Sequence, residues 1–196
     1  MARDEHLEIR SGSLTRIPMA FTLRKATLGD IPVLEGLITT SARELSRDDY
    51  SEAQIEAAIG TAWGVDTELI RDETYFVAEA AGEIVACGGW SRRKTLFGAD
   101  AQAGRESKVL DPRRDSARIR AFFVRPDWAR QGIGRALLAR CEAEARAHGF
   151  RSAELVATLP GQRLYTMFGY AGTERVEYPL VTGLTIEFVP MKKDPI

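Results

Sequence analysis

Cysteine and histidine are scarce in this sequence, with two of each among 196 residues. Cys87 and Cys141 lie in apolar segments without CxxC spacing, so we expect buried, reduced thiols and no disulfide. Neither His6 nor His148 has a partner at the spacing of metal ligands. The sequence therefore predicts no metal site.

An excess of one charge and a long hydrophobic run are also missing. The formal net charge is −1, which gives no electrostatic basis for binding nucleic acid. No segment approaches the roughly 18 consecutive apolar residues of a membrane-spanning helix. The first twenty residues contain acids and no apolar core, unlike a secretory signal. We therefore predict a cytoplasmic protein that binds neither nucleic acid nor membrane.

The apolar content of 44% and the chain length fit one domain with a substantial core. We predict a poorly ordered extension over residues 1–19 and a single domain over residues 20–196. Alternating patterns predict strands at 21–26, 74–80, 82–90, 117–124, 152–159, 173–180 and 184–191. Helical spacing predicts helices at 33–44, 51–60, 132–147 and 163–168. This order predicts a mixed α/β (α+β) fold.

Helix-start signals support two of these helices. Asp30 is placed to act as an N-cap, with Pro32 in the first helical turn. Ser51 and Gln54 have the spacing of a capping box at the start of the next helix. Gly149 follows the helix predicted at 132–147 and is expected to end it.

A long polar insertion is predicted at 91–117, between two strands. It exceeds the usual loop length, so we expect it to be either functional or mobile. Residues 91–120 contain nine Arg or Lys against four Asp or Glu. Two interpretations remain open: a solvated surface loop, or a flap over an acidic ligand.

The stretch FFVRPDWARQGIGRALL, residues 122–138, places two glycines where a helix is predicted to begin. A helix N-terminus presents unpaired backbone N–H groups and the positive end of its dipole. Gly132 and Gly134 would let a phosphate approach that backbone, and Arg130 and Arg135 add positive charge. The alternative is an ordinary tight turn between a strand and a helix.

Two common phosphate motifs do not fit this stretch. A P-loop requires Lys followed by Ser or Thr after its second glycine, and neither follows Gly134. A dinucleotide-binding fingerprint requires a third glycine where this sequence has Leu137.

Residues 124–138 resemble the acetyl-coenzyme A loop of the GNAT superfamily of N-acetyltransferases, whose pattern is Arg/Gln-x-x-Gly-x-Gly/Ala. The two glycines match, whereas Ala129 occupies the first position of the pattern. The resemblance, over about residues 21–190, implies a splayed mixed β-sheet flanked by helices, with acetyl-CoA as co-substrate. It also implies that the cofactor binds Phe122, Phe123, Val124, Arg130, Gln131, Gly132, Ile133, Gly134 and Arg135.

A second stretch, ATLPGQRLYTMFGY at residues 157–170, matches the family at Tyr165 and at the closing Gly169-Tyr170 pair. The asparagine that the family often has falls on Thr158, whose hydroxyl can still bind the cofactor arm. The resemblance implies Tyr165 as the general acid that protonates the leaving thiolate. It also implies the backbone N–H of Val124 as the oxyanion donor. For Tyr165, packing in the core is the alternative.

No general base is predicted, because Arg120 occupies the position where some family members have a glutamate. Arg118 and Arg120 share a strand face and could bind an anionic group of the acceptor, with an ion-paired or solvated arginine row as the alternative. The resemblance implies direct acetyl transfer to an amine; we expect a small molecule as the acceptor, with a protein N-terminus or lysine as the other candidate acceptor. A non-catalytic coenzyme A-binding regulatory module is the alternative, and family resemblance adds the expectation of a homodimer.

Overall fold

The computed structural model describes residues 20–180 and 183–196, so the extension predicted at 1–19 lies outside the described residues. In the described part, seven strands form one mixed sheet in the order β1-β2-β3-β4-β5-β7-β6. The strands are β1 (Thr22–Lys25), β2 (Tyr75–Ala80), β3 (Glu83–Ser91), β4 (Ala117–Val124), β5 (Ala153–Ala157), β6 (Val176–Pro179) and β7 (Thr185–Lys193). The predicted mixed fold class is confirmed.

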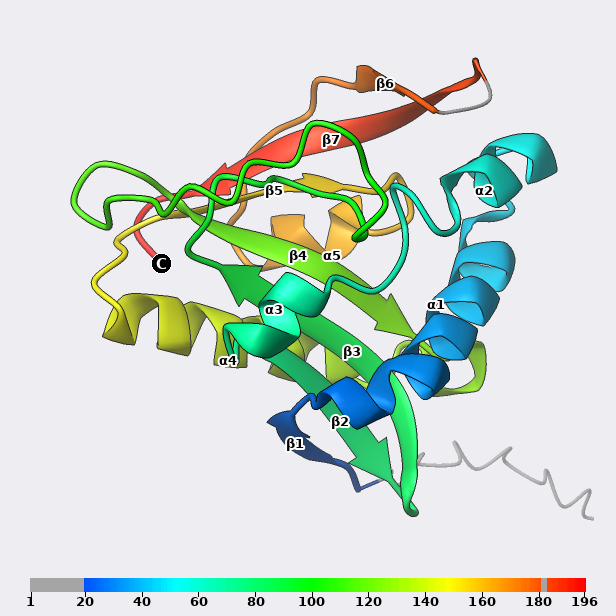
Figure 1. Cartoon of the computed structure of the whole chain (residues 1–196), viewed down its shortest axis with the longest axis horizontal. Helices are drawn as coiled ribbons and strands as arrows, with labels where there is room; N and C mark the ends of the chain where they lie inside the picture. The colour runs from blue at the N-terminus through cyan, green and yellow to red at the C-terminus, as the bar shows by residue number, and fades with distance from the viewer. Residues whose placement is uncertain (1–19, 181–182) are drawn as a thin grey trace, which may run out of the picture.

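Helices cover both faces of this sheet. The helices are α1 (Ile31–Ser46), α2 (Glu52–Ala58), α3 (Thr67–Arg71), α4 (Ile133–Ala147) and α5 (Gln162–Met167), with 3-10 turns η1 (Leu28–Asp30) and η2 (Pro126–Trp128). Buried side chains of α1, α2 and α3 form one hydrophobic cluster on one face of the sheet. Those of α4 and α5 join another cluster on the opposite face. In Figure 1, α3 accordingly lies in front of the sheet and α4 behind it.

Local signals locate the starts of both α1 and α2, but only α2 has the side-chain cap that its signal predicts. The capping box is confirmed, because Gln54 N–H donates to Ser51 Oγ and Ser51 N–H donates to Gln54 Oε1. Asp30 is the N-cap residue of α1 and Pro32 lies in its first turn, as predicted, but the Asp30 side chain makes no capping hydrogen bond. Its carboxylate instead accepts from Thr27 N–H and from the guanidinium of Arg24. A charged partner on β1 is a stronger ligand for this carboxylate than a helix N–H.

Strand β4 diverges from β5, its parallel neighbour. The two strands pair only at Ala117 with Ala153 and at Arg118 with Glu154. Farther along β4, the register with β3 shifts between Cys87 and Gly89. Ala121 has φ 57°, a left-handed conformation that marks the extra residue of a β-bulge. Figure 1 shows β4 and β5 separating, with α5 in the space between their ribbons, as the predicted splayed sheet requires.

The insertion at 91–117 folds back on itself. Its two legs are joined where Leu110 N–H donates to Arg92 O and Lys94 N–H donates to Lys108 O. Farther out, Ala99 N–H donates to Thr61 O in the segment before α3. These bonds place the middle of the insertion against the same sheet face as α2 and α3. Phe97, in this part of the insertion, packs against the hydrophobic cluster that α1, α2 and α3 form.

Candidate functional site

A cavity of about 500 Å³ lies where β4 and β5 separate. Its lining includes members of both hydrophobic clusters: Ile133 and Tyr165 from one face of the sheet, Trp63 and Phe188 from the other. The cavity therefore passes through the sheet. The end of β4 agrees with this arrangement, because Phe122 packs against one cluster and its neighbour Phe123 against the other.

One end of the cavity is cationic, and we call it the cationic half, lined by Arg130, Gly132, Gly134, Arg135 and Arg163. No described residue accepts a hydrogen bond from the backbone N–H groups of residues 132–135. Gly132 adopts φ 87°, and a Cβ added there would meet no atom within 4 Å, so the space above it is open. A Cβ on Gly134 would lie 3.2 Å from Leu164 Cδ2, so that glycine permits close packing of α5. This is the chemistry of an anion site at a helix N-terminus.

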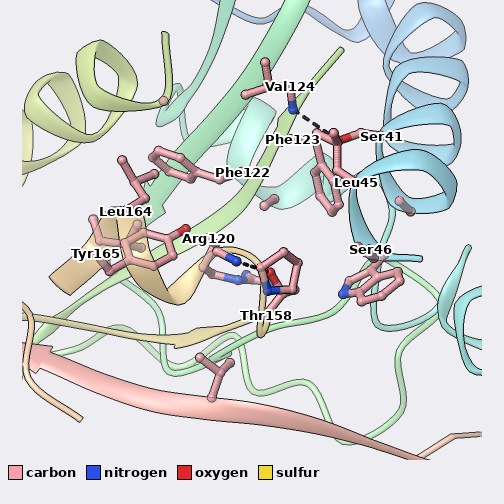
Figure 2. Close-up of a pocket in the computed structure, with 18 of the residues that line it drawn as sticks. Ser41, Leu45, Ser46, Arg120, Phe122, Phe123, Val124, Thr158, Leu164 and Tyr165 are labelled. Atoms are coloured by element: carbon pink, nitrogen blue, oxygen red, sulfur yellow. Dashed lines mark hydrogen bonds between the residues drawn. The ribbon is translucent and has the colours of Figure 1, made fainter. Parts of the chain in front are cut away.

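The middle of the cavity is formed by the end of β4 and by α5. Val124 N–H, which does not bond to a neighbouring strand, donates to Ser41 Oγ at 3.3 Å. Figure 2 shows this bond and shows the hydroxyl of Tyr165 directed into the cavity opposite Phe123. Thr158 lines the same region, and its Oγ1 accepts from Gly161 N–H. A polar backbone donor and a phenol thus face one another across an apolar space.

Tyr165 is the titratable side chain best suited to hold a proton here. Its residue is 8% exposed, and no described residue hydrogen-bonds its hydroxyl. Burial raises the pKa of Tyr165 well above its ordinary value, because the phenolate form is poorly solvated. The ring packs edge-on against Phe122 and Tyr170, with centroids 6.2 and 5.9 Å away. The hydroxyl is therefore held in place and protonated, as a proton donor must be.

The other end, which we call the aromatic half, is lined by Leu45, Trp63, Phe97, Phe123 and Phe188. These residues come from α1, the segment before α3, the insertion, β4 and β7. Ring centroids of Phe97 and Phe188 are 5.6 Å apart, and those of Trp63 and Phe188 are 6.4 Å apart. The insertion thus contributes an aromatic wall to the cavity.

A buried ion cluster lies behind that wall. Asp66 Oδ2 is 2.6 Å from Arg120 Nη1, and Asp66 Oδ1 is 2.7 Å from Arg105 Nη2. The side chains of Asp66 and Arg120 are 0% and 1% exposed. Arg120 Nη2 also donates to Gly98 O, next to Phe97. Burial lowers the pKa of Arg120, and Asp66 opposes that shift. The cluster therefore fastens the insertion to β4.

Most of the residues predicted for the site line this one cavity: Arg120, Phe122, Phe123, Val124, Arg130, Gly132, Ile133, Gly134, Arg135, Thr158 and Tyr165. Gln131 does not line it; its side chain donates to Asp127 O. Arg118 does not line it either and pairs with Glu154. Both Arg118 and Arg120 thus have carboxylate partners within the protein. Binding of an anionic acceptor by these arginines stays a prediction.

The aromatic half was missed by sequence reasoning. Phe97 offered a signal, because it is the one aromatic residue of the polar insertion. Leu45 and Phe188 offered none, because their spacing is that of ordinary core residues. Arg163 and Ser41 were also missed, although Arg163 lies two residues before Tyr165.

None of the Asp, Glu, His or Cys side chains of the described residues form a group of three or more that could hold a metal ion. No helix within 20–180 or 183–196 combines the length and the apolar character needed to cross a bilayer. Cys87 and Cys141 are both free and buried, as expected.

Comparison with known proteins agrees with this geometry. Residues 39–170, more than half of the chain, match the profile of the acetyltransferase (GNAT) family. Among curated proteins, no sequence gives a significant match.

Several solved structures share the fold. A GCN5-related N-acetyltransferase from Rhodopseudomonas palustris is 20% identical, with a TM-score of 0.67 over 91% of this chain and 98% of that one. YncA from Salmonella typhimurium, solved with its cofactor acetyl-CoA, is 17% identical, with a TM-score of 0.58 over 89% and 94%. The ribosomal-protein-S18-alanine N-acetyltransferase of Escherichia coli is 18% identical, with a TM-score of 0.56 over 90% and 94%.

Proposed function

Because the chain belongs to the acetyltransferase (GNAT) family and is an acyltransferase, we propose that it moves the acetyl group of acetyl-CoA directly to a small-molecule amine. One observation carries the proposal. A single cavity leads from a helix N-terminus surrounded by arginines, past a protonated tyrosine, to an aromatic pocket on the other face of the sheet. One substrate can therefore enter from each face and meet the other at the bulge.

The cationic half fits the anionic end of acetyl-CoA. Open space over Gly132 and free N–H groups at the start of α4 can receive phosphate oxygens. Arg130, Arg135 and Arg163 add charge, and none of the described lining residues is an acid. The cofactor supplies a thioester, whose carbonyl carbon is the acetyl donor.

The protein groups at the centre have two tasks in this proposal. Val124 N–H stabilises the negative charge that develops on the carbonyl oxygen during attack, exchanging Ser41 Oγ for that oxygen. Tyr165 donates its proton to the departing sulfur, since its raised pKa keeps it protonated at neutral pH. Amine and thioester react within one complex, since Cys87 and Cys141 are buried away from the cavity. We also propose a cytoplasmic location, with which two free, buried cysteines agree.

Thermal unfolding with acetyl-CoA tests the cavity. At about 100 times its Kd, a ligand adds about 2.7 kcal/mol of stability, or about 5–11 °C in Tm for a chain of this size. NAD is the control and should shift nothing. Equal shifts with both, or none with acetyl-CoA, would contradict the proposal.

A matched pair of variants on α4 localises the binding. Arg135→Gln should raise the Kd for acetyl-CoA about 10- to 100-fold, the usual value of a hydrogen bond to a charged group. Arg146→Gln removes the same charge from the other end of the helix, where the side chain is 48% exposed, and should leave the Kd unchanged. Similar losses in both variants would point to general electrostatics and not to this site.

A further inference from the structure

The aromatic half is a preformed wall of rings in edge-on and tilted contact. Phe188 lies edge-on to Phe97 and tilted against Trp63. Tyr50 supports Trp63 from behind, with centroids 5.6 Å apart, and Tyr178 supports Phe97 at 4.9 Å. Trp63 is 4% and Phe188 2% exposed, so the rings are fixed by packing. Such a wall is complementary to a flat apolar body.

The described lining of the same half contains no acidic side chain that could pair with a cation. None of the described residues lining the cavity is Asp, Glu or His. The arginine of this half, Arg120, is already paired with Asp66 and bonded to Gly98 O. The remaining lining arginines belong to the cationic half, on the other face of the sheet. A positively charged amine would lose its hydration here without gaining a counter-ion.

The basicity of the amine decides how large this cost is, because it sets the fraction of molecules that carry the charge at neutral pH. An alkylamine with a pKa near that of lysine, about 10.4, is uncharged in only about 0.04% of molecules at pH 7. It must lose a proton before attack, and the cavity offers no carboxylate or imidazole to take it. An arylamine is a much weaker base, because its lone pair is delocalised into the ring, and it is already uncharged at neutral pH.

We propose that the acceptor is a weakly basic aromatic amine, bound in the aromatic half with its nitrogen directed toward the bulge. This inference rests on the proposed acetyl transfer. The nitrogen lone pair forms the N–C bond as the C–S bond breaks. Tyr165 gives its proton to the sulfur, the nitrogen releases one proton to water, and Tyr165 regains a proton from water, so that no net proton is consumed. The products are an N-aryl acetamide and free coenzyme A thiol.

Two isomeric amines separate the effect of basicity from that of molecular size. 4-Methylaniline and benzylamine have the same atoms, but only benzylamine is an alkylamine. With the full chain and acetyl-CoA, kcat/KM at pH 7 should be at least about tenfold higher for 4-methylaniline, measured by thiol release and by mass detection of the amide. Its rate should stay flat from pH of about 6.5 to about 8.5, whereas that of benzylamine should rise about tenfold per pH unit.

A pair of variants tests whether the lack of a carboxylate in the aromatic half causes the preference for 4-methylaniline over benzylamine. Leu45→Glu places a carboxylate in the aromatic half, at a residue that is 37% exposed and can accept it. It should reduce the preference for 4-methylaniline over benzylamine at least about tenfold. Leu28→Glu, at a residue 52% exposed outside the cavity, is the control and should leave the preference unchanged.

The outcomes separate this inference from the function beneath it. If acetyl-CoA binds and benzylamine or another alkylamine is the better acceptor at pH 7, acetyl transfer stands and the aromatic acceptor is refuted. Acetyl-CoA binding with no acetylated arylamine refutes the inference as well. If acetyl-CoA does not stabilise the protein at all, the proposed function fails, and the acceptor inference fails with it.

Discussion

Asp66→Asn is the most informative perturbation of the fold, because it removes one charge and almost no volume. Asn caps a helix about as well as Asp, so the bond from Glu68 N–H to the side chain at 66 can persist. The variant therefore isolates the ion pairs to Arg120 and Arg105. It leaves the guanidinium of Arg120, 1% exposed, without its carboxylate.

The expected loss follows from this burial. Removing one partner of a buried ion pair costs about 3–5 kcal/mol, since the other charge stays buried. For a domain of this size, each kcal/mol lowers Tm by about 2–4 °C, so Tm should fall by about 6–20 °C. Added salt should change this little, because buried pairs are screened less than exposed ones.

Denaturant unfolding and calorimetry measure the loss, with Glu187→Gln as the matched control. Glu187 pairs with Arg175, but the two side chains are 39% and 59% exposed, so the control should lose at most about 1 kcal/mol. A loss for Asp66→Asn no larger than that of the control would refute the reasoning. It would mean that water or rearranged side chains replace the buried carboxylate.

The cluster also connects stability to the cavity. Arg120 donates a hydrogen bond to Gly98 O, and the residue before Gly98 is Phe97, which lines the aromatic half. Folded Asp66→Asn protein should therefore show a raised KM for the acceptor amine, while its Kd for acetyl-CoA stays unchanged. If the variant instead binds acetyl-CoA more weakly and its KM for the amine is unchanged, the cluster acts on the cationic half and this prediction is wrong.

The remaining predictions concern single groups. Tyr165→Phe should lower kcat about 100-fold or more with the Kd for acetyl-CoA unchanged, and full activity would show that Tyr165 is not the acid. Gly132→Ala should cost about 1–2 kcal/mol, because φ 87° strains any residue with a Cβ, and should weaken acetyl-CoA binding. Arg24 holds the pKa of Asp30 at about 2, below its unfolded value near 4, so stability from this pair is present above pH about 4 and is lost as pH falls toward 2. Asp30→Asn should flatten acid unfolding over that range, and an unchanged pH profile would contradict the assignment.

The sequence alone determined the features that depend on near neighbours. A few neighbouring residues specify the capping box of Ser51 and Gln54 and the glycine turn that leads into α4. The glycines, Tyr165 and the order of strands and helices were enough to predict the fold class and most of the residues that line the cationic half. Each is a local signal, because helix starts and turns are decided by backbone geometry over three or four positions.

Tertiary structure alone decided what depends on distant segments. Asp30 has a good capping position, yet the charge of Arg24 on β1 takes its carboxylate away from the helix. The bulge at Ala121 arises where β3 and β4 pair, and the extra residue shifts the alternation of side chains, so it decides which face of the sheet Phe122 and Phe123 each meet. The aromatic half joins five separate segments, and Asp66 reaches Arg120 from 54 residues away. No local pattern specifies such contacts, because they form only when the folded sheet brings these segments together.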